Sequence, residues 1–323
     1  MTRLPALALV LLLALPGPVQ AAGLDPQAVE QAQSFAQGDG KAIDPAMIRL
    51  QVLLDRSRFS PGVIDGLAGD IVRKAIAAYE VANGLDGKDD AALLQALAAE
   101  DGKPVLQRYT ISEKDVQGPF VMKVPDRLED MAKLAHLSFT SPRELLAEKF
   151  HMDEDLLEAL NPGADFARAG SGITVAQVAA RDEKETVTRI DVVKGQGALY
   201  AYDAQDRLVA FYPASIGSEG TPSPTGTHEV SAIAPEPKYY YNPKELNFSG
   251  VKTKDLLEIA AGPNNPVGTV WIDLTEPTYG IHGTPEPALI AKTQSHGCVR
   301  LTNWDAEELS KMVKKGTAVT FME

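Results

Sequence analysis

The chain has 323 residues, of which 44% are hydrophobic and 23% charged, which is typical of folded proteins and long enough for two or three domains. Its formal net charge of −13 argues against nucleic acid as a partner, because phosphate binding requires an excess of Lys and Arg. The single Cys, at position 298, excludes an intramolecular disulfide.

Residues 1–21 have the pattern of a secretory signal peptide. Arg3 supplies a positive start, an apolar run extends from Ala6 to Leu15, and small residues end the segment at Ala21. A run of about ten residues is too short to cross about 30 Å of hydrocarbon, and no Cys follows the cleavage pattern. We therefore expect an exported protein, cleaved near Ala21 and without a stable membrane anchor.

Residues 22–43 are predicted to be a linker, with a loosely held helix over 23–40 as the alternative, and residues 44–100 a small helical domain. Apolar residues recur at helical spacing from Met47 to Leu54 and again from Ile71 to Tyr79, with an Ile64-Asp65-Gly66 turn between and a helix stop at Asn83-Gly84. This arrangement resembles the peptidoglycan-binding domain found beside many wall enzymes. The alternative is a helical hairpin that binds no ligand.

Residues 106–180 are less regular. A short strand is predicted at 109–111, a helix at 128–135, and a second helix starting at Ser141, with Ser as the N-cap and Pro142 in the first turn. The end of this segment resembles the second half of a lysin-motif module, which binds glycan, although extra residues near 118–127 depart from that pattern. His136 and His151 are interpreted as surface or packing residues.

Residues 186–323 are predicted to be mostly β, a sandwich or barrel with helical decoration. Alternating segments at 186–192, 198–202 and 207–212 are separated by turn residues. A helix is expected at 303–314, stopped by Gly316, and a final strand at 318–321.

Two clusters in this part carry residues suited to nucleophilic catalysis: Tyr279-Gly-Ile-His282-Gly283-Thr and Ser295-His296-Gly297-Cys298-Val-Arg300. A thiol with a pKa of about 8.5 needs a base at neutral pH, and either His282 or His296 could accept its proton. Gly297 permits a tight turn in which backbone N–H groups of 297 and 298 face a developing oxyanion. Arg300 is interpreted either as a partner for thiolate and substrate carboxylate or as a structural ion pair.

These clusters are similar to the signature of the L,D-transpeptidase catalytic domain, also called the YkuD-type domain. The likeness extends over residues 186–323, including the segments 221–226, 241–243, 262–268 and 303–305. The resemblance implies that Cys298 is the nucleophile, that His282 is the base, that the carbonyl of Gly283 orients the imidazole, and that His296 has a supporting role. It also indicates Arg300, Ser295, Tyr279, Asn264 and Asn265 as substrate-binding residues.

The implied reaction is acyl transfer on peptidoglycan stem peptides, with no cofactor and no metal. Cys298 would attack the carbonyl of the third stem residue and release D-Ala, and the thioester would pass to an amine of a second stem, to an outer-membrane lipoprotein, to a D-amino acid or to water. Such an enzyme serves cell-wall organisation and cell shape, and carbapenems are expected to acylate its thiol.

Two rival hypotheses remain open at this stage. A metal hydrolase could use His282, His296 and Cys298 as ligands, but the spacings typical of zinc sites are missing. A peptidoglycan-binding protein with an inactive catalytic domain would instead act through residues 44–180.

Overall fold

The computed structural model describes residues 23–35, 40–85, 87, 89–178, 185–217, 220–244, 253–295 and 297–323. The predicted signal peptide, residues 1–21, lies outside this range, and so does His296. Within these residues, no helix has the length and apolar character needed to span a membrane.

The N-terminal part is helical, as predicted for residues 44–100. Asp44 caps the first long helix, where its side chain accepts a hydrogen bond from the Ala46 N–H at 2.9 Å and Pro45 occupies the first turn. The next helix ends at Gly84, whose φ of 66° confirms the predicted stop. The helices are α1 (Pro26–Gln31), α2 (Pro45–Arg56), α3 (Asp70–Asn83) and α4 (Asp90–Ala99).

The middle part pairs two distant strands antiparallel, with helices between them in the chain. Its elements are β1 (Leu106–Thr110), α5 (Glu113–Gln117), α6 (Leu128–Met131), α7 (Pro142–Lys149), α8 (Glu154–Leu160) and β2 (Gly172–Ala176). The predicted N-cap is confirmed, since the Ser141 hydroxyl accepts from the Glu144 N–H at 3.1 Å. The helix predicted at 128–135 is shorter in the structure, because α6 ends at Met131 and buries no side chain whose packing would stabilise further turns.

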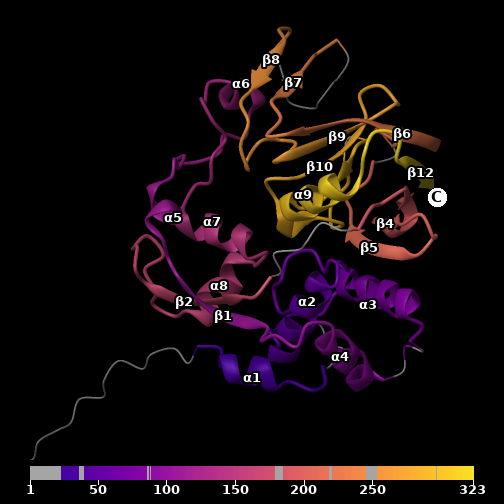
Figure 1. Ribbon diagram of the computed structural model, residues 1–323. Coiled ribbons are helices and arrows are strands. Elements are labelled where there is room, and N and C mark those ends of the chain that lie inside the picture. The colour runs from indigo at the N-terminus through magenta and orange to yellow at the C-terminus, as the bar shows by residue number, and fades with distance from the viewer. Residues whose placement is uncertain are drawn as a thin grey trace, which may run out of the picture.

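The helical and middle parts share one hydrophobic core. A single buried cluster includes Leu50 and Leu54 of α2, Leu157 of α8 and Val175 of β2. His151 contributes to the same packing, because its Nδ1 lies 2.9 Å from Asp55 Oδ1 and its ring stacks on Trp304. Residues 44–100 and 106–180 are therefore packed against each other over their apolar faces (Figure 1).

The C-terminal part is an eight-stranded sheet with the order β11-β10-β9-β6-β12-β3-β4-β5. The sheet curls until its two edges meet, because Ser215, just after β5, exchanges both backbone hydrogen bonds with Arg300 of β11 at 2.9 Å. This closure bears out the predicted mostly-β fold. The elements are β3 (Arg189–Val193), η1 (Lys194–Gln196), β4 (Ala198–Tyr202), β5 (Leu208–Pro213), β6 (Gly226–Pro235), β7 (Tyr239–Tyr241), β8 (Leu257–Ile259), β9 (Val270–Leu274), β10 (Gly280–His282), η2 (Pro287–Leu289), β11 (Val299–Arg300), α9 (Asn303–Met312) and β12 (Ala318–Met322).

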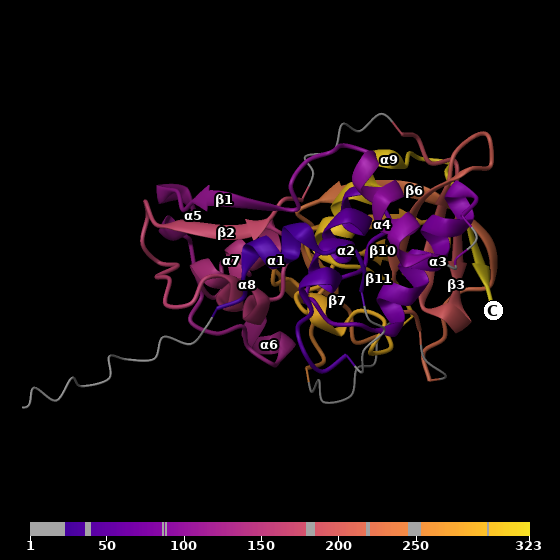
Figure 2. The same ribbon diagram turned by 90° about the horizontal axis from the view of Figure 1, so that it is seen from below.

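The helical part covers the outer edge of this sheet. The Ser60 N–H donates to the Phe211 carbonyl, and the Phe211 N–H donates to the Arg58 carbonyl, both at 2.9 Å, so residues 58–60 extend the sheet beyond β5. The Phe211 side chain is fully buried in the core of the N-terminal half. Figure 2 shows α2, α3 and α4 lying across the strands of the C-terminal part.

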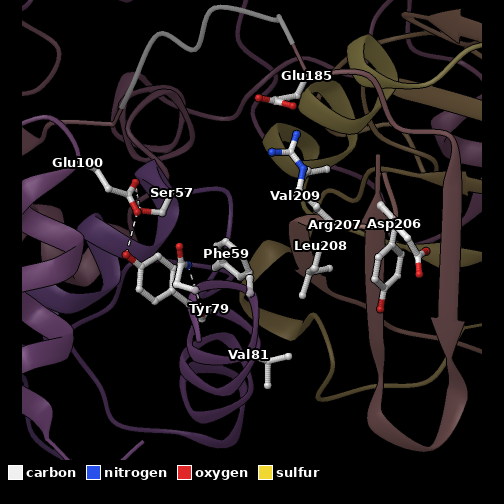
Figure 3. Close-up of a pocket in the computed structure, with 13 residues that line it drawn as sticks. Ser57, Phe59, Tyr79, Val81, Glu100, Glu185, Asp206, Arg207, Leu208 and Val209 are labelled. Atoms are coloured by element: carbon white, nitrogen blue, oxygen red, sulfur yellow. Dashed lines mark hydrogen bonds between the residues drawn. The ribbon is translucent and has the colours of Figure 1, made fainter. Parts of the chain in front are cut away.

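A cavity of about 540 Å³ opens along this junction, between α3 and β5 (Figure 3). On one wall, the Glu100 carboxylate accepts hydrogen bonds from the hydroxyls of Tyr79 and Ser57, at 2.9 and 2.7 Å. Arg207, Leu208 and Val209 form the facing wall. The lining residues include neither Cys298 nor His282, so this cavity is separate from the residues suited to catalysis.

Candidate active site

The two predicted reactive side chains lie on the same face of the sheet. Strand β10 pairs in parallel with β11, with Ile281 opposite Val299. Gly280 and His282 flank Ile281 along the chain, and Cys298 and Arg300 flank Val299. Ile281 and Val299 are fully buried in the core. Because side chains alternate along a strand, His282 and its direct partner Arg300 point to the opposite face, and Cys298 immediately precedes β11.

His282 is held as a neutral imidazole with one nitrogen committed. Its Nδ1 lies 2.7 Å from the Gly283 carbonyl oxygen, which is a pure acceptor, so Nδ1 carries the proton and Nε2 keeps its lone pair. Burial, with the nearby positive charge of Arg300, lowers the pKa of His282 to about 3. The imidazole is therefore neutral at pH 7, with the lone pair of Nε2 unprotonated.

Trp271 covers the imidazole and was missed in the sequence analysis. Its ring stacks on His282 with a centroid separation of 5.5 Å and an interplanar angle of 18°. Gly280 makes room for it, because a Cβ at 280 would lie 2.5 Å from the indole ring. The signal was available: Val270, Ile272 and Leu274 alternate with Trp271 and Asp273, which predicts a strand with the Trp on the polar face.

The Cys298 thiol is protonated at rest. Burial raises its pKa, while a hydrogen bond from the Gly280 N–H and the charge of Arg300 act in the opposite direction. The sulfur lies 3.8 Å from the Thr278 carbonyl oxygen, a weak contact for a thiol donor. The raised pKa of the thiol and the lowered pKa of His282 favour the neutral forms of both side chains over an ion pair.

The turn before Cys298 is closed by side-chain hydroxyls. Ser295 Oγ donates to the Cys298 carbonyl and accepts from the Gly297 N–H at 3.1 Å, so this amide is engaged within the protein. Gly297 has a φ of 116°, and a Cβ there would lie 2.8 Å from the Tyr279 ring. Ser223 Oγ donates to the Gly297 carbonyl at 2.5 Å, a contact that the sequence analysis did not single out. Ser295 and Gly297 thus shape the turn, and of the two amides predicted to face an oxyanion, that of Gly297 is occupied.

Arg300 extends along the same face with a partly buried guanidinium. Burial lowers its pKa, and the opposing influences come from Glu286 and Cys298. Its Nε is buried without a hydrogen-bond acceptor among the described residues. A cation in this position is able to meet an anionic group of a ligand.

Asn264 and Asn265 are buried and point into the protein. The Asn264 amide donates to the Ser138 carbonyl and to Glu144, at 2.9 and 2.7 Å. The Asn265 amide donates to the Ala260 carbonyl at 2.7 Å and accepts from the Val267 N–H. Their amides are already used, so the structure gives them a role in holding the 260–268 loop rather than in meeting substrate. Tyr279 is half-buried, and its hydroxyl donates to the Pro222 carbonyl at 3.2 Å.

A small hairpin of β7 and β8 adds a tyrosine to the site. Burial raises the pKa of Tyr239, and the charge of an ionised Cys298 acts in the same direction. In Figure 1 this hairpin projects beside α6 at the top of the molecule. Among the described residues, no group of three or more His, Cys, Asp or Glu is suited to bind a metal ion.

The fold and the site together define a class of protein: a curled β-sheet domain that carries a thiol and a neutral imidazole on one face. Residues 187–321 match the family model YkuD, the L,D-transpeptidase catalytic domain. This part of the chain therefore belongs to the YkuD family of L,D-transpeptidase catalytic domains, as predicted, and a domain of this family implies an acyltransferase. The match does not reach residues 44–100 or 106–180, so the two resemblances noted there stay predictions.

The chain is also similar to individual proteins. The putative L,D-transpeptidase YkuD of Bacillus licheniformis is 29% identical over 177 residues, which is 55% of this chain and 91% of that protein. The probable L,D-transpeptidase ErfK/SrfK of Escherichia coli is 30% identical over 190 residues, 57% of this chain and 60% of that protein. L,D-transpeptidase 3 from Mycobacterium tuberculosis, solved with a faropenem-derived adduct, is 16% identical with a TM-score of 0.35, and the likeness covers 48% of this chain and 65% of that one.

Proposed function

We propose that this protein is a peptidoglycan L,D-transpeptidase in which Cys298 is the nucleophile and His282 the general base. One observation supports the proposal: Cys298 accepts a hydrogen bond from the Gly280 N–H, two residues before His282 on β10, while Gly283 fixes the imidazole with Nε2 unprotonated. Similarity to L,D-transpeptidases of Bacillus licheniformis and Escherichia coli supports the substrate class.

In the first half of the reaction, Sγ of Cys298 attacks the carbonyl carbon of the third stem residue, a diamino acid such as meso-diaminopimelate. The thiol proton passes to Nε2 of His282, and then to the amine of the departing D-Ala. The resting protonation states support this order, because the thiol holds its proton and the imidazole has room for it.

Charge that develops on the carbonyl oxygen requires a hydrogen-bond donor. We assign this role to the Cys298 N–H, since the Gly297 N–H already donates to Ser295 Oγ. His296 keeps its predicted supporting role as a proposal. Arg300 lies near the sulfur and is proposed to pair with the stem carboxylate, and Tyr239 and Tyr279 to form walls of the substrate groove.

In the second half, an acceptor resolves the thioester. An amine of a second stem gives a 3→3 cross-link, water gives an L,D-carboxypeptidase, and an amine of a lipoprotein or of a D-amino acid gives attachment or exchange. The covalent first half is common to all of these outcomes. We propose that the protein acts outside the cytoplasmic membrane, where this substrate lies, after export by the signal predicted at residues 1–21.

Incubation of the purified protein with a disaccharide-tetrapeptide, followed by mass spectrometry, tests the proposal. We expect loss of D-Ala with formation of a dimer or a tripeptide, and no product from Cys298→Ala. Exposure to imipenem should add the mass of the drug to the wild-type protein alone. A protein that shows neither change, yet sediments with purified sacculi, would instead be an inactive wall-binding protein.

A further inference from the structure

The first turn of α9 connects the catalytic part to the N-terminal half through three successive residues. Asn303 Nδ2 donates to both carboxylate oxygens of Glu148 in α7, at 3.1 and 3.2 Å. Trp304 stacks on His151, with ring centroids 4.9 Å apart. Asp305 accepts a buried hydrogen bond from the Ser60 hydroxyl at 2.8 Å. Three parts of the chain that are far apart in sequence thus meet at one helix start.

Asn303 also reaches the peptide that holds the proposed base. Its Oδ1 accepts from the Thr284 N–H at 3.0 Å and from the Thr269 N–H at 3.2 Å. The N–H of Thr284 and the C=O of Gly283 belong to the same peptide unit and point in opposite directions in a trans peptide. One end of this unit is therefore fixed by Asn303, while the other accepts from Nδ1 of His282.

The fit around Asn303 is tight. The side chain is buried, with 2% exposed, and a Cβ placed on Gly283 or Gly268 would lie 2.2 or 2.1 Å from its Oδ1. An Asn side chain can rotate by half a turn about its Cβ–Cγ bond, which would direct its NH2 group at the Thr284 N–H. The two carboxyl oxygens of Glu148, with the Pro263 carbonyl at 3.1 Å, keep the NH2 group on the other side.

We propose that Asn303 is a positioning residue for His282 and that Glu148, supplied by the N-terminal half, fixes Asn303 in the orientation that this requires. The N-terminal half is then part of the catalytic apparatus, in addition to any binding of wall polymer. The inference rests on the proposed role of His282 as the base.

The test follows the reactivity of the Cys298 thiol toward iodoacetamide from pH 6 to pH 10, because alkylation does not depend on transpeptidase chemistry. His282→Ala should slow alkylation near pH 7, since the thiol then lacks its proton acceptor. Glu148→Met should reproduce part of this loss, about fivefold or more at pH 7. Its rate should converge with that of the wild type at high pH, where the thiol ionises unaided.

Two matched variants separate positioning from stability. Glu148→Gln retains an oxygen that accepts from Asn303 and should restore the wild-type pH profile. Ser60→Ala removes the neighbouring contact to Asp305 and should lower the melting temperature without changing the profile. A Glu148→Met protein with a lower melting temperature and an unchanged profile would overturn the proposal, because Glu148 would then be structural only.

Two further outcomes are distinguishable. A wild-type profile in His282→Ala would refute the proposed base and the positioning role with it, whatever Glu148 does. If Glu148→Met does not fold, hydrogen exchange of the Thr284 amide in the unsubstituted protein decides. We expect it to exchange as slowly as the amides of β10, and rapid exchange would show that Asn303 does not hold this peptide.

Discussion

The active-site face and the α9 junction differ in how their residues are distributed along the chain. On the active-site face, His282 lies in β10, Arg300 lies in β11 and Cys298 comes just before β11, and only 16 positions separate His282 from Cys298. At the junction, Ser60, Glu148 and Asn303 come from three separate regions. Reactive groups are thus encoded locally, whereas the groups that hold them are encoded at a distance.

The largest effect is expected from the local cluster itself. His282→Ala should lower turnover on the order of 10² to 10⁴-fold, because proton transfer from the thiol then depends on solvent. Steady-state kinetics with the disaccharide-tetrapeptide, together with circular dichroism to verify folding, provides the measurement. Activity within a few-fold of the wild type would mean that another group is the base. The reactive groups would then not all lie in the local cluster.

The junction can be tested through its largest apolar contact. Phe211 of β5 is fully buried in the core of the N-terminal half, so Phe211→Ala should lower the free energy of unfolding by about 3–5 kcal/mol. Chemical denaturation measures this loss. Leu208→Ala, on the same strand but only partly buried, serves as a control with a smaller expected loss. Equal losses of stability in Phe211→Ala and Leu208→Ala would mean that Phe211 is not the main contact between the N-terminal half and the C-terminal sheet.

A substitution at Asn264 tests whether this side chain holds the 260–268 loop or contacts the substrate. Asn264→Ala leaves the Ser138 carbonyl and the Glu144 carboxylate without a buried donor, which should cost about 1–3 kcal/mol of stability. The KM for the donor peptide should not change. An increase in KM at unchanged stability would restore the substrate-binding role expected from the sequence.

The last prediction concerns the pH dependence of stability that Glu148 produces. Burial raises the pKa of this carboxyl to about 8, the nearby carboxylates of Glu144 and Glu307 add to the rise, and the Asn303 hydrogen bond opposes it. The folded state favours the neutral acid, so its stabilisation is fully present below the ordinary pKa of 4.5 and is lost as the pH rises through 8. Melting temperatures from pH 5 to pH 9 should therefore fall more steeply in the wild type than in Glu148→Gln, whose amide mimics the neutral acid. Parallel curves would contradict this assignment.

Sequence patterns predicted the elements whose signals lie within a few residues. Asp44 and Ser141 mark helix starts, Gly84 marks a stop, and alternation marks β4 (Ala198–Tyr202) at its observed bounds. They did not predict that β12 lies between β6 and β3, because strand order depends on contacts across the whole domain. Nor did they separate Asn264 and Asn265, which hold a loop, from residues that line a groove. Burial distinguishes these two roles. The burial of Asn264 depends on contacts with Ser138 and Glu144, which lie more than a hundred positions earlier in the chain.

The central place of β12 has a consequence for synthesis. This strand runs parallel to β3 and antiparallel to β6, so residues 318–322 supply the backbone pairing between the β11-β10-β9-β6 strands and the β3-β4-β5 strands. A nascent chain that already contains Cys298 therefore still lacks the strand that joins these two groups of strands. Complete pairing of the sheet that carries the active-site face therefore requires residues 318–322 as well as β10 and β11.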